Sequence, residues 1–343
     1  VRALGAWMAL TWRREAASTV LSGIILGTGL AIALFSPSDA WLDLVFQVAL
    51  WGTIAIAWNI IGGFGGQLSL GHSSFYGLGA YAAALLLLRC GISPIIGALA
   101  GIILAIALAL LVGLAGLRLR GPFFAMATFV MGPALQTIAT NLTSFTGGSG
   151  GLSLPLHGDW TTLIFASRRV YVLIALAFLA VALLLAYRLR YTATGMRLIS
   201  AGNDPAVAGS LGINVLAVRL GGMALSAALT AICGTLATVY TLFIDPENAF
   251  GAALSIRAVT VAIIGGTGTV AGPLLGAVTL IPMEQFLSNS LVGTLPGLSS
   301  VLVGLLLVFV VVVVPGGLAK GLETLRVKFG PRSAPKHAEV AAP

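Results

Sequence analysis

The sequence predicts an all-α polytopic membrane protein with about ten transmembrane helices and with both termini in the cytoplasm. Hydrophobic residues make up 58% of the 343 positions and charged residues only 8%, which is more apolar surface than a soluble core can bury. Apolar runs of about 20 residues, the length of a membrane-spanning helix, recur along the chain. The runs are continuous rather than alternating between apolar and polar residues, which excludes a transmembrane β-barrel.

Ten apolar segments are candidates for crossing the bilayer. We expect them at about 20–35, 41–61, 68–88, 95–116, 122–140, 171–187, 220–243, 254–265, 272–288 and 299–314. The segment at 254–265 is short and ends in Gly265-Gly266-Thr267-Gly268, so a half-helix and a full crossing both stay open.

The chain divides into three parts. Residues 1–19 mix tryptophan with arginine, which favours an interfacial helix on the cytoplasmic face. Residues 20–318 form the transmembrane domain. The polar tail at 319–343 has no apolar periodicity, so we expect it to be disordered.

The distribution of positive charge supports ten crossings that begin in the cytoplasm. Of the 18 Lys and Arg residues, this topology leaves only Arg89, Arg168, Arg169 and Arg257 outside. Such an excess inside is the usual signature of membrane orientation. The formal charge of +8 is therefore explained by topology, and no nucleic-acid partner is expected.

A polar loop at 188–219 is the longest interior stretch that could not lie in lipid. Its arginines place it in the cytoplasm. Asn203 or Asp204 is a suitable N-cap for a short helix that starts at Pro205 and stops at Gly212. A capped helix in a cytoplasmic loop favours docking of a soluble partner, and the alternative is a solvated connector.

The most polar membrane-embedded stretch runs from Trp58 to Gly77. Uncharged polar side chains in lipid must face other helices or water, so this stretch either lines a solute path or joins helices through hydrogen bonds. Thr128 and Gln136 occupy another span, interrupted by a Gly-Pro pair that produces either a cavity or a packing kink. The candidate path residues are Asn59, Gln67, Ser69, His72, Ser73, Thr128 and Gln136.

Glycine-rich patterns occur both at span ends and in the largest loop. The sequence IIGGFG at 60–65 is echoed by IIGGTG at 263–268, which is either a pointer to a transport pathway or a coincidence. TGGSGGL at 146–152 lies in the largest external loop, 141–170, and its composition is typical of a flexible linker. As a functional site, Thr146, Gly147, Gly148 and Ser149 would contact an external receptor.

Several enzyme classes are excluded. The chain has no G-x-x-x-x-G-K-[ST] and no H-E-x-x-H, so it is neither a P-loop ATPase nor a zincin of that type. Carboxylates lie at span ends or in loops, Asp43 and Glu284 being nearest to lipid depth, whereas a proton-driven carrier usually needs them in mid-membrane. His72 and Ser73 are neighbours on one helix and cannot face each other as a catalytic dyad. No catalytic or metal-ligating residue is expected.

The chain resembles the LivM-type permeases of ATP-driven importers for branched-chain amino acids and related small solutes. Four blocks carry the likeness: Asn59–Tyr81, which contains GQLSLGH, Arg120–Phe129, the TGGSGGL loop, and Gly202–Val215. The importer coupling signature E-A-A-x-x-x-G is matched in its small residues and spacing, but the glutamate is missing. The TGGSGGL loop also departs from the commoner form, so branched-chain amino acids are the first expectation for the solute, with urea, short amides and other amino acids as alternatives.

The resemblance implies a multi-pass protein of the bacterial plasma (inner) membrane that works with several partners. These are a LivH-type second permease subunit, two cytosolic ABC ATPases that bind ATP and Mg, and an external or periplasmic solute-binding protein. Membrane lipid surrounds the assembly, and this chain itself holds no cofactor. The residues expected to couple it to the ATPases are Gly202, Asn203, Asp204, Pro205, Ala208, Gly212, Ile213 and Asn214. The competing class is a stand-alone channel or secondary carrier.

Overall fold

The computed structural model describes residues 2–36, 38–116, 122–155, 164–165, 167–291, 304–305 and 317–319. Its elements, in order, are α1 (Arg2–Phe35), α2 (Asp39–Asn59), the π-helix η1 (Ile60–Phe64), α3 (His72–Cys90), α4 (Pro94–Gly116), α5 (Pro122–Asn141), α6 (Thr143–Thr146), the 3₁₀-helix η2 (Gly148–Gly150), β1 (Leu152–Ser153), α7 (Arg168–Tyr191), α8 (Ala193–Asn203), α9 (Pro205–Ser210), α10 (Val215–Thr241), β2 (Phe243–Ile244), α11 (Pro246–Phe250), α12 (Ala252–Gly265) and α13 (Gly272–Leu291).

The all-α polytopic fold is confirmed. In the described part of the chain, six stretches are long and apolar enough to cross a membrane: Asp39–Phe64, α3, α4, α5, α7 and α10. Two shorter apolar stretches are Thr19–Phe35 and α12, which has 14 residues. The segment expected at 299–314 and the tail at 319–343 lie almost entirely outside the described residues, so ten crossings stay a prediction.

The ends of two spans differ from the sequence prediction. Helix α1 runs without a break from Arg2 to Phe35, so residues 2–19 continue the first span rather than forming a separate helix. Whether they lie along the membrane surface stays a prediction. The span expected from residue 68 begins at His72, because residues 65–71 are not helical.

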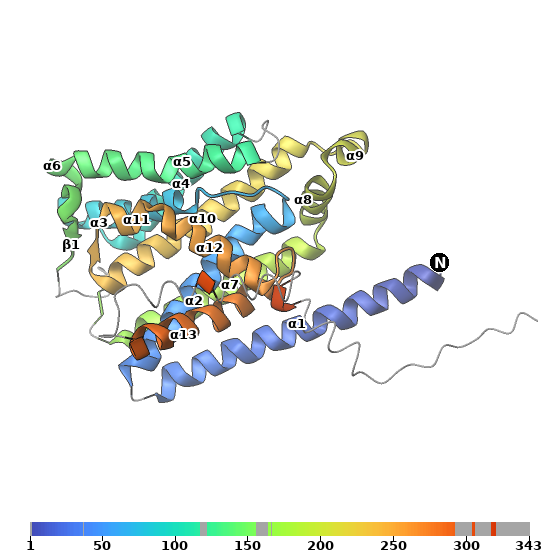
Figure 1. The fold of residues 1–343 in the computed structure, drawn as a ribbon, viewed down its shortest axis with the longest axis horizontal. Helices are drawn as coiled ribbons and strands as arrows, with labels where there is room; N and C mark the ends of the chain where they lie inside the picture. Colours follow the sequence, from blue (N-terminus) through green and yellow to red (C-terminus); the bar gives the residue numbers. More distant parts are fainter. Residues whose placement is uncertain are drawn as a thin grey trace, which may run out of the picture.

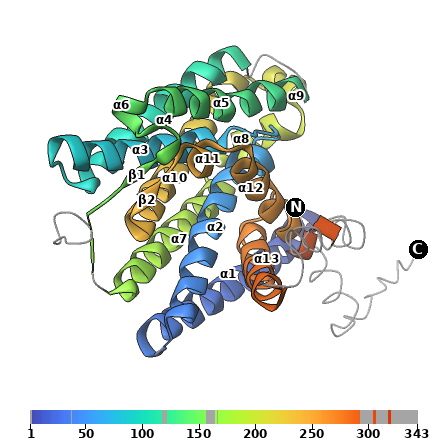
Figure 2. The same cartoon turned by 60° about the vertical axis from the view of Figure 1, so that its left-hand side comes forward.

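The helices form layers. In Figures 1 and 2, α4 and α5 lie on one side of the molecule, α1 and α13 on the opposite side, and α2, α7 and α10 between them. Figure 1 also shows α6 and β1 at one end of the bundle, with α8, α9 and the N-terminal end of α1 at the other. At the first end, β1 and β2 pair antiparallel, with Leu152 opposite Ile244.

Close packing between α3, α10 and α4 depends on glycine. A Cβ on Gly79 of α3 would lie 2.0 Å from the carbonyl oxygen of Ala231 in α10, and a Cβ on Gly234 equally close to that of Tyr76. Small residues allow such close approach of helix backbones, which in a membrane replaces the hydrophobic driving force. The buried residues of α4 are also almost all small, and its exposed residues include Leu99, Ile103 and Leu111.

Candidate functional site

A non-helical segment, Gly65–Gly71, joins η1 to α3, and its residues alternate between buried Gln67 and Ser69 and exposed Gly66 and Leu68. Irregular backbone at membrane depth requires other protein groups to satisfy it. The N–H of Gln67 donates to the carbonyl of Ile61 at 3.0 Å, and the N–H of Leu70 donates to Thr128 Oγ1, also at 3.0 Å. Gly66 has φ +62°, a conformation that favours glycine and turns the chain out of the helix.

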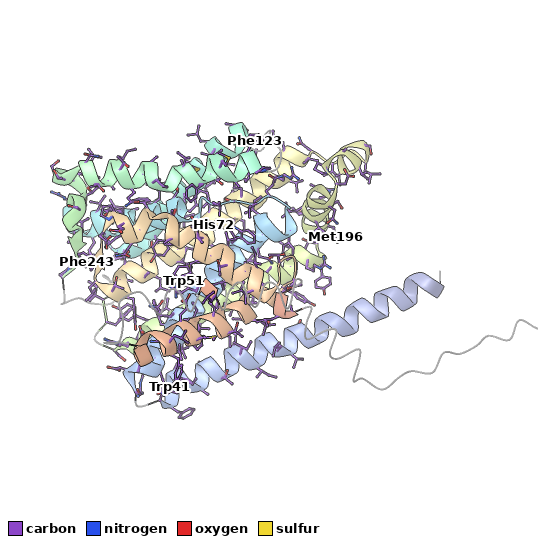
Figure 3. All side chains as sticks on the ribbon, in the orientation of Figure 1. Trp41, Trp51, His72, Phe123, Met196 and Phe243 are labelled. Atoms are coloured by element: carbon purple, nitrogen blue, oxygen red, sulfur yellow. The ribbon has the colours of Figure 1, made fainter. Side chains whose placement is uncertain are left out.

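Polar side chains from three helices meet where α3 begins. His72 Nε2 lies 2.8 Å from Ser226 Oγ of α10. The N–H of Ser73 donates to Ser255 Oγ of α12 at 2.9 Å, and Ser255 Oγ donates to Ser73 Oγ at 3.1 Å. All four side chains are at most 1% exposed, and Figure 3 shows His72 in the interior of the bundle. These contacts correspond to one of the two alternatives from the sequence, hydrogen bonds between helices, and the role of the stretch as a solute path stays a prediction.

Some polar atoms in this cluster have no partner in the described part of the protein. His72 Nδ1 and Ser74 Oγ are buried and form no hydrogen bond. A buried polar atom without a partner costs about 1–3 kcal/mol, so such atoms call for an explanation. The cluster therefore keeps hydrogen-bonding capacity that this arrangement of the helices does not use.

The other predicted path residues lie at different distances from this cluster. The carbonyl of Ser69 accepts a hydrogen bond from Trp58 Nε1 at 2.7 Å, and Thr128 holds the segment through Leu70. Gln136 stands apart on α5: it is two turns, about 12 Å, beyond Thr128, it is half-buried, and its backbone carbonyl accepts from Thr140. The structure thus gathers six of the seven residues around η1 and the Gly65–Gly71 segment.

The two echoed glycine patterns are in contact through Asn59. Asn59 Nδ2 donates to the carbonyl of Thr269, and Asn59 Oδ1 accepts from the N–H of Gly268, both at 2.8 Å. A Cβ on Gly63 would lie 1.9 Å from Asn59 Oδ1 and 2.6 Å from the nitrogen of Gly268. The glycines let the end of the second span and the turn between α12 and α13 approach each other closely.

The short helix predicted in the polar loop at 188–219 is confirmed as α9. Asp204 is its N-cap, because Oδ1 accepts from the N–H groups of Ala206 at 2.9 Å and Val207 at 3.1 Å. Pro205 is its first residue, and Gly212 has φ +81° just after its end. Of the remaining predicted coupling residues, Asn203 is exposed, Gly202 and Ile213 are half-buried, Ala208 is buried, and Asn214 caps α10 by accepting from Ala217 N.

A second capped helix, α8, precedes α9, and the sequence prediction missed it. Thr192 accepts from the N–H of Gly195 at its start. The sequence does carry signals for it, because Thr192 is a suitable N-cap and the residues that become buried, Gly195, Leu198 and Ala201, recur every three positions. On α8, on α9 and just after α9, three large apolar side chains are more than half exposed: Met196, Val207 and Leu211. Exposed apolar groups gathered outside the spans indicate an interaction surface.

The glycine-rich loop at 146–152 is a defined turn rather than the flexible linker that its composition predicts. Thr146 is buried and donates to the carbonyl of Leu142 at 2.8 Å. Gly147, Gly148 and Gly151 have φ between +58° and +78°, so glycine is needed for the shape of the turn. Among the predicted receptor-contact residues, Ser149 is exposed, Gly147 is half-buried, and Thr146 and Gly148 are buried.

Two charged side chains within the helices, Arg257 and Asp43, have partners on neighbouring helices. Arg257 of α12 forms an ion pair with Glu284 of α13, and its guanidinium lies 4.3 Å from the ring centre of Trp51. Asp43 accepts from Tyr240 OH at 2.9 Å. Arg257 lies within the helix expected at 254–265, and its place on the external side stays a prediction. In the part of the chain that the structure describes, no group of His, Cys, Asp and Glu is arranged to hold a metal ion.

Comparison with known proteins decides the family. The family model described as the branched-chain amino acid transport system permease component matches residues 40–311. The chain belongs to this family. The permease therefore is a multi-pass inner-membrane subunit of an importer, as the resemblance of its motifs predicts.

Relatives of both permease types are similar to this permease. It is 27% identical to the high-affinity branched-chain amino acid transport system permease protein LivM of Escherichia coli K12, over 79% of this chain and 70% of the relative. It is 24% identical to LivH of Salmonella typhimurium, over 80% of this chain and 92% of the relative. The autoinducer 2 import system permease protein LsrC of Salmonella choleraesuis matches 32% of this chain at 31% identity. No solved structure matches the chain.

Proposed function

We propose that this permease moves branched-chain amino acids, or similar small polar solutes, from an external binding protein across the inner membrane at the expense of ATP. It works beside a LivH-type second permease, and two cytosolic ATPases bind the ATP and Mg that this chain does not bind. The observation that carries the proposal, beside the family, is the α8–α9 surface: Met196, Val207 and Leu211 are exposed apolar groups outside the membrane spans, positioned for a soluble partner.

Reconstituted transport tests the proposal. Proteoliposomes would contain the permease, its partner permease and both ATPases, with the solute-binding protein supplied on its own side and radiolabelled leucine as the solute. We expect uptake that requires ATP, both ATPases and the binding protein. Uptake by this permease without any ATPase would contradict the proposal and favour a stand-alone channel or secondary carrier. ATP-dependent uptake of urea or acetamide in place of leucine would support the proposal of an importer but would contradict the proposed solute.

We propose ten crossings with both termini in the cytoplasm, so that α8 and α9 face the cytosol. The positive charge of residues 188–219 supports this orientation, and β1 lies at the opposite end of the bundle from α8 and α9. We expect a reporter fused after Ser153 to lie on the external side and a reporter fused after Asn203 to lie in the cytosol, because α7 lies between the two positions in the chain. Alkaline phosphatase and green fluorescent protein fusions measure the two sides, and finding both positions on one side would contradict the topology.

We propose that the polar cluster at the start of α3 serves the cytoplasmic end of the solute path. Support comes from the unpartnered His72 Nδ1 and Ser74 Oγ, which offer hydrogen bonds to a solute once the helices separate. The cluster is uncharged, whereas tight binding of a zwitterion needs paired charges. His72→Ala is therefore expected to lower the maximal rate of leucine uptake several-fold and to leave the half-saturating concentration unchanged. A large change in that concentration at a preserved rate would instead make His72 a selectivity residue.

We propose that the external turn at Thr146–Ser149 contacts the solute-binding protein. Its most accessible side chain is Ser149, and the positive-φ glycines hold it at the end of the bundle opposite α9. Binding of the receptor to vesicles that carry Ser149→Trp measures this contact. Unchanged receptor affinity would place the contact elsewhere.

A further inference from the structure

Arg219 is a charged side chain that the protein buries between two separate parts of the chain. It lies near the start of α10 and is only 7% exposed, although its place at the end of a polar loop predicts a solvated residue. Its Nη2 donates to the carbonyl of Ala201 in α8 at 2.8 Å. In the amide orientation that pairs donors with acceptors, the oxygen of Gln67 accepts from Nη1 at 2.7 Å and from Nη2 at 3.0 Å.

This arrangement is costly for a residue that only fills space. Burying a guanidinium requires compensation for its lost hydration. Among the residues that the structure describes, no carboxylate forms an ion pair with Arg219, and its Nε has no partner. The charge is stabilised by two neutral oxygens, one on α8 and one on the Gly65–Gly71 segment. A planar guanidinium holds two such acceptors at fixed angles, which a lysine ammonium does not.

Backbone contacts connect the same two parts of the chain. A Cβ on Gly202 at the end of α8 would lie 2.4 Å from the carbonyl oxygen of Phe64, and a Cβ on Gly66 would lie 2.5 Å from that of Gly202. Leu198 of α8 is 2% exposed and packs beside Gly65, where a Cβ would approach its methyl group to 3.3 Å. Because no side chain separates α8 from the turn at Gly66, a displacement of α8 must displace that turn.

We infer that Arg219 is a positioning residue that transmits movement of α8 and α9 to Gln67 and so to the start of α3. The inference rests on the proposed docking of an ATPase at α8 and α9. The non-helical segment Gly65–Gly71, which contains Gln67, leads from η1 to the start of α3. Leu70 is bonded to Thr128 of α5, and His72 is bonded to Ser226 of α10. A displacement of Gln67 is therefore transmitted to the polar cluster at the start of α3.

The test measures how many leucine molecules are transported per ATP hydrolysed in proteoliposomes of the complete importer. Arg219→Gln removes the charge and one of the paired contacts and is expected to lower this ratio at least tenfold, while the ATPase binds with unchanged affinity. Arg219→Lys should give an intermediate ratio. Gln67→Glu keeps an acceptor for the guanidinium and should retain coupling, whereas Gln67→Ala should lose it. Arg188→Gln, an exposed arginine at the end of α7, is the matched control and should behave as the wild type.

The ratio separates positioning from a purely structural role. If uptake and hydrolysis fall together in Arg219→Gln, so that the ratio is unchanged, the inference is overturned. If Arg219→Gln does not reach the membrane, Gln67→Ala decides by the same ratio, since it alters only a non-helical segment. Wild-type protein that shows no ATP-dependent uptake would instead show that the proposed function has failed. Coupled transport in wild type, Arg219→Gln and Gln67→Ala alike would defeat this inference alone.

Discussion

Replacing Gly79 with alanine is expected to remove most of the folded permease from the membrane. The added methyl group would lie 2.0 Å from the carbonyl oxygen of Ala231, well inside van der Waals contact, and the obstacle is backbone that cannot rotate away. Helices α3 and α10 would have to separate, which also breaks the hydrogen bond from Thr235 Oγ1 to the carbonyl of Gly79. We expect a loss of about 3 kcal/mol, the upper end for overpacked interiors, or roughly a hundredfold in the folding equilibrium.

The measurement is the yield of monodisperse permease after detergent extraction, together with its thermal unfolding midpoint. Gly221→Ala is the matched control on α10, because nothing lies within 4 Å of the position its Cβ would take. That variant should extract as well as the wild type, with a gain of up to ~1 kcal/mol from helix propensity. If the Gly79→Ala variant has the same yield and unfolding midpoint as the wild type, α3 and α10 do not cross this closely.

Replacing Leu211 with aspartate is expected to abolish ATP-driven leucine uptake without disturbing the fold. The side chain is 74% exposed just after α9, so no packing inside the permease is lost. Docking of an ATPase over it would bury a leucine, worth about 1.5–3 kcal/mol. A carboxylate at the same point would also have to lose its hydration. Uptake in the reconstituted importer should fall to background at ATPase concentrations that saturate the wild type.

Two further substitutions define the origin of this effect. Leu211→Met keeps an apolar side chain of similar volume and should transport normally. Gly212→Trp places a bulky residue at φ +81° beside the same surface and should uncouple transport while membrane insertion stays intact. Normal transport by Leu211→Asp or Gly212→Trp would place the ATPase contact elsewhere on the molecule.

The helices that the sequence predicts best are those whose apolar length alone defines them. Helix α4 begins at Pro94 and α5 ends at Asn141, each within one residue of the expected boundary. The short helix α9 was predictable for a different reason, because Asp204-Pro205 and Gly212 are local start and stop signals. Composition and capping are both properties of neighbouring residues, so one sequence is enough to detect them.

The features that the sequence does not predict depend on distant parts of the chain. The partners of α8 are one such feature: Leu198, on its buried face, packs against Gly65 at the end of η1 and against Gly222 of α10. Gly65–Gly71 is not helical, and it is held by Thr128 and Gly202 from other elements.

The polar cluster shows the same limit for the candidate site. His72 is conspicuous in the sequence as a histidine in an apolar span, but its partner Ser226 is 154 residues away. Ser73 and Ser255 are separated by 182 residues. Arg219 is the clearest case, because its position in a basic loop predicts exposure and only the packing of α8 explains its burial.

Direct binding of the ATPase to the permease tests the central claim that α8 and α9 form the docking site. Purified ATPase would be titrated onto the permease and its partner in lipid nanodiscs, and the dissociation constant measured for wild type, Leu211→Met and Leu211→Asp. The account predicts equal affinity for the first two, and for Leu211→Asp a loss of at least about thirtyfold, which corresponds to about 2 kcal/mol. Equal affinity for all three proteins would contradict it.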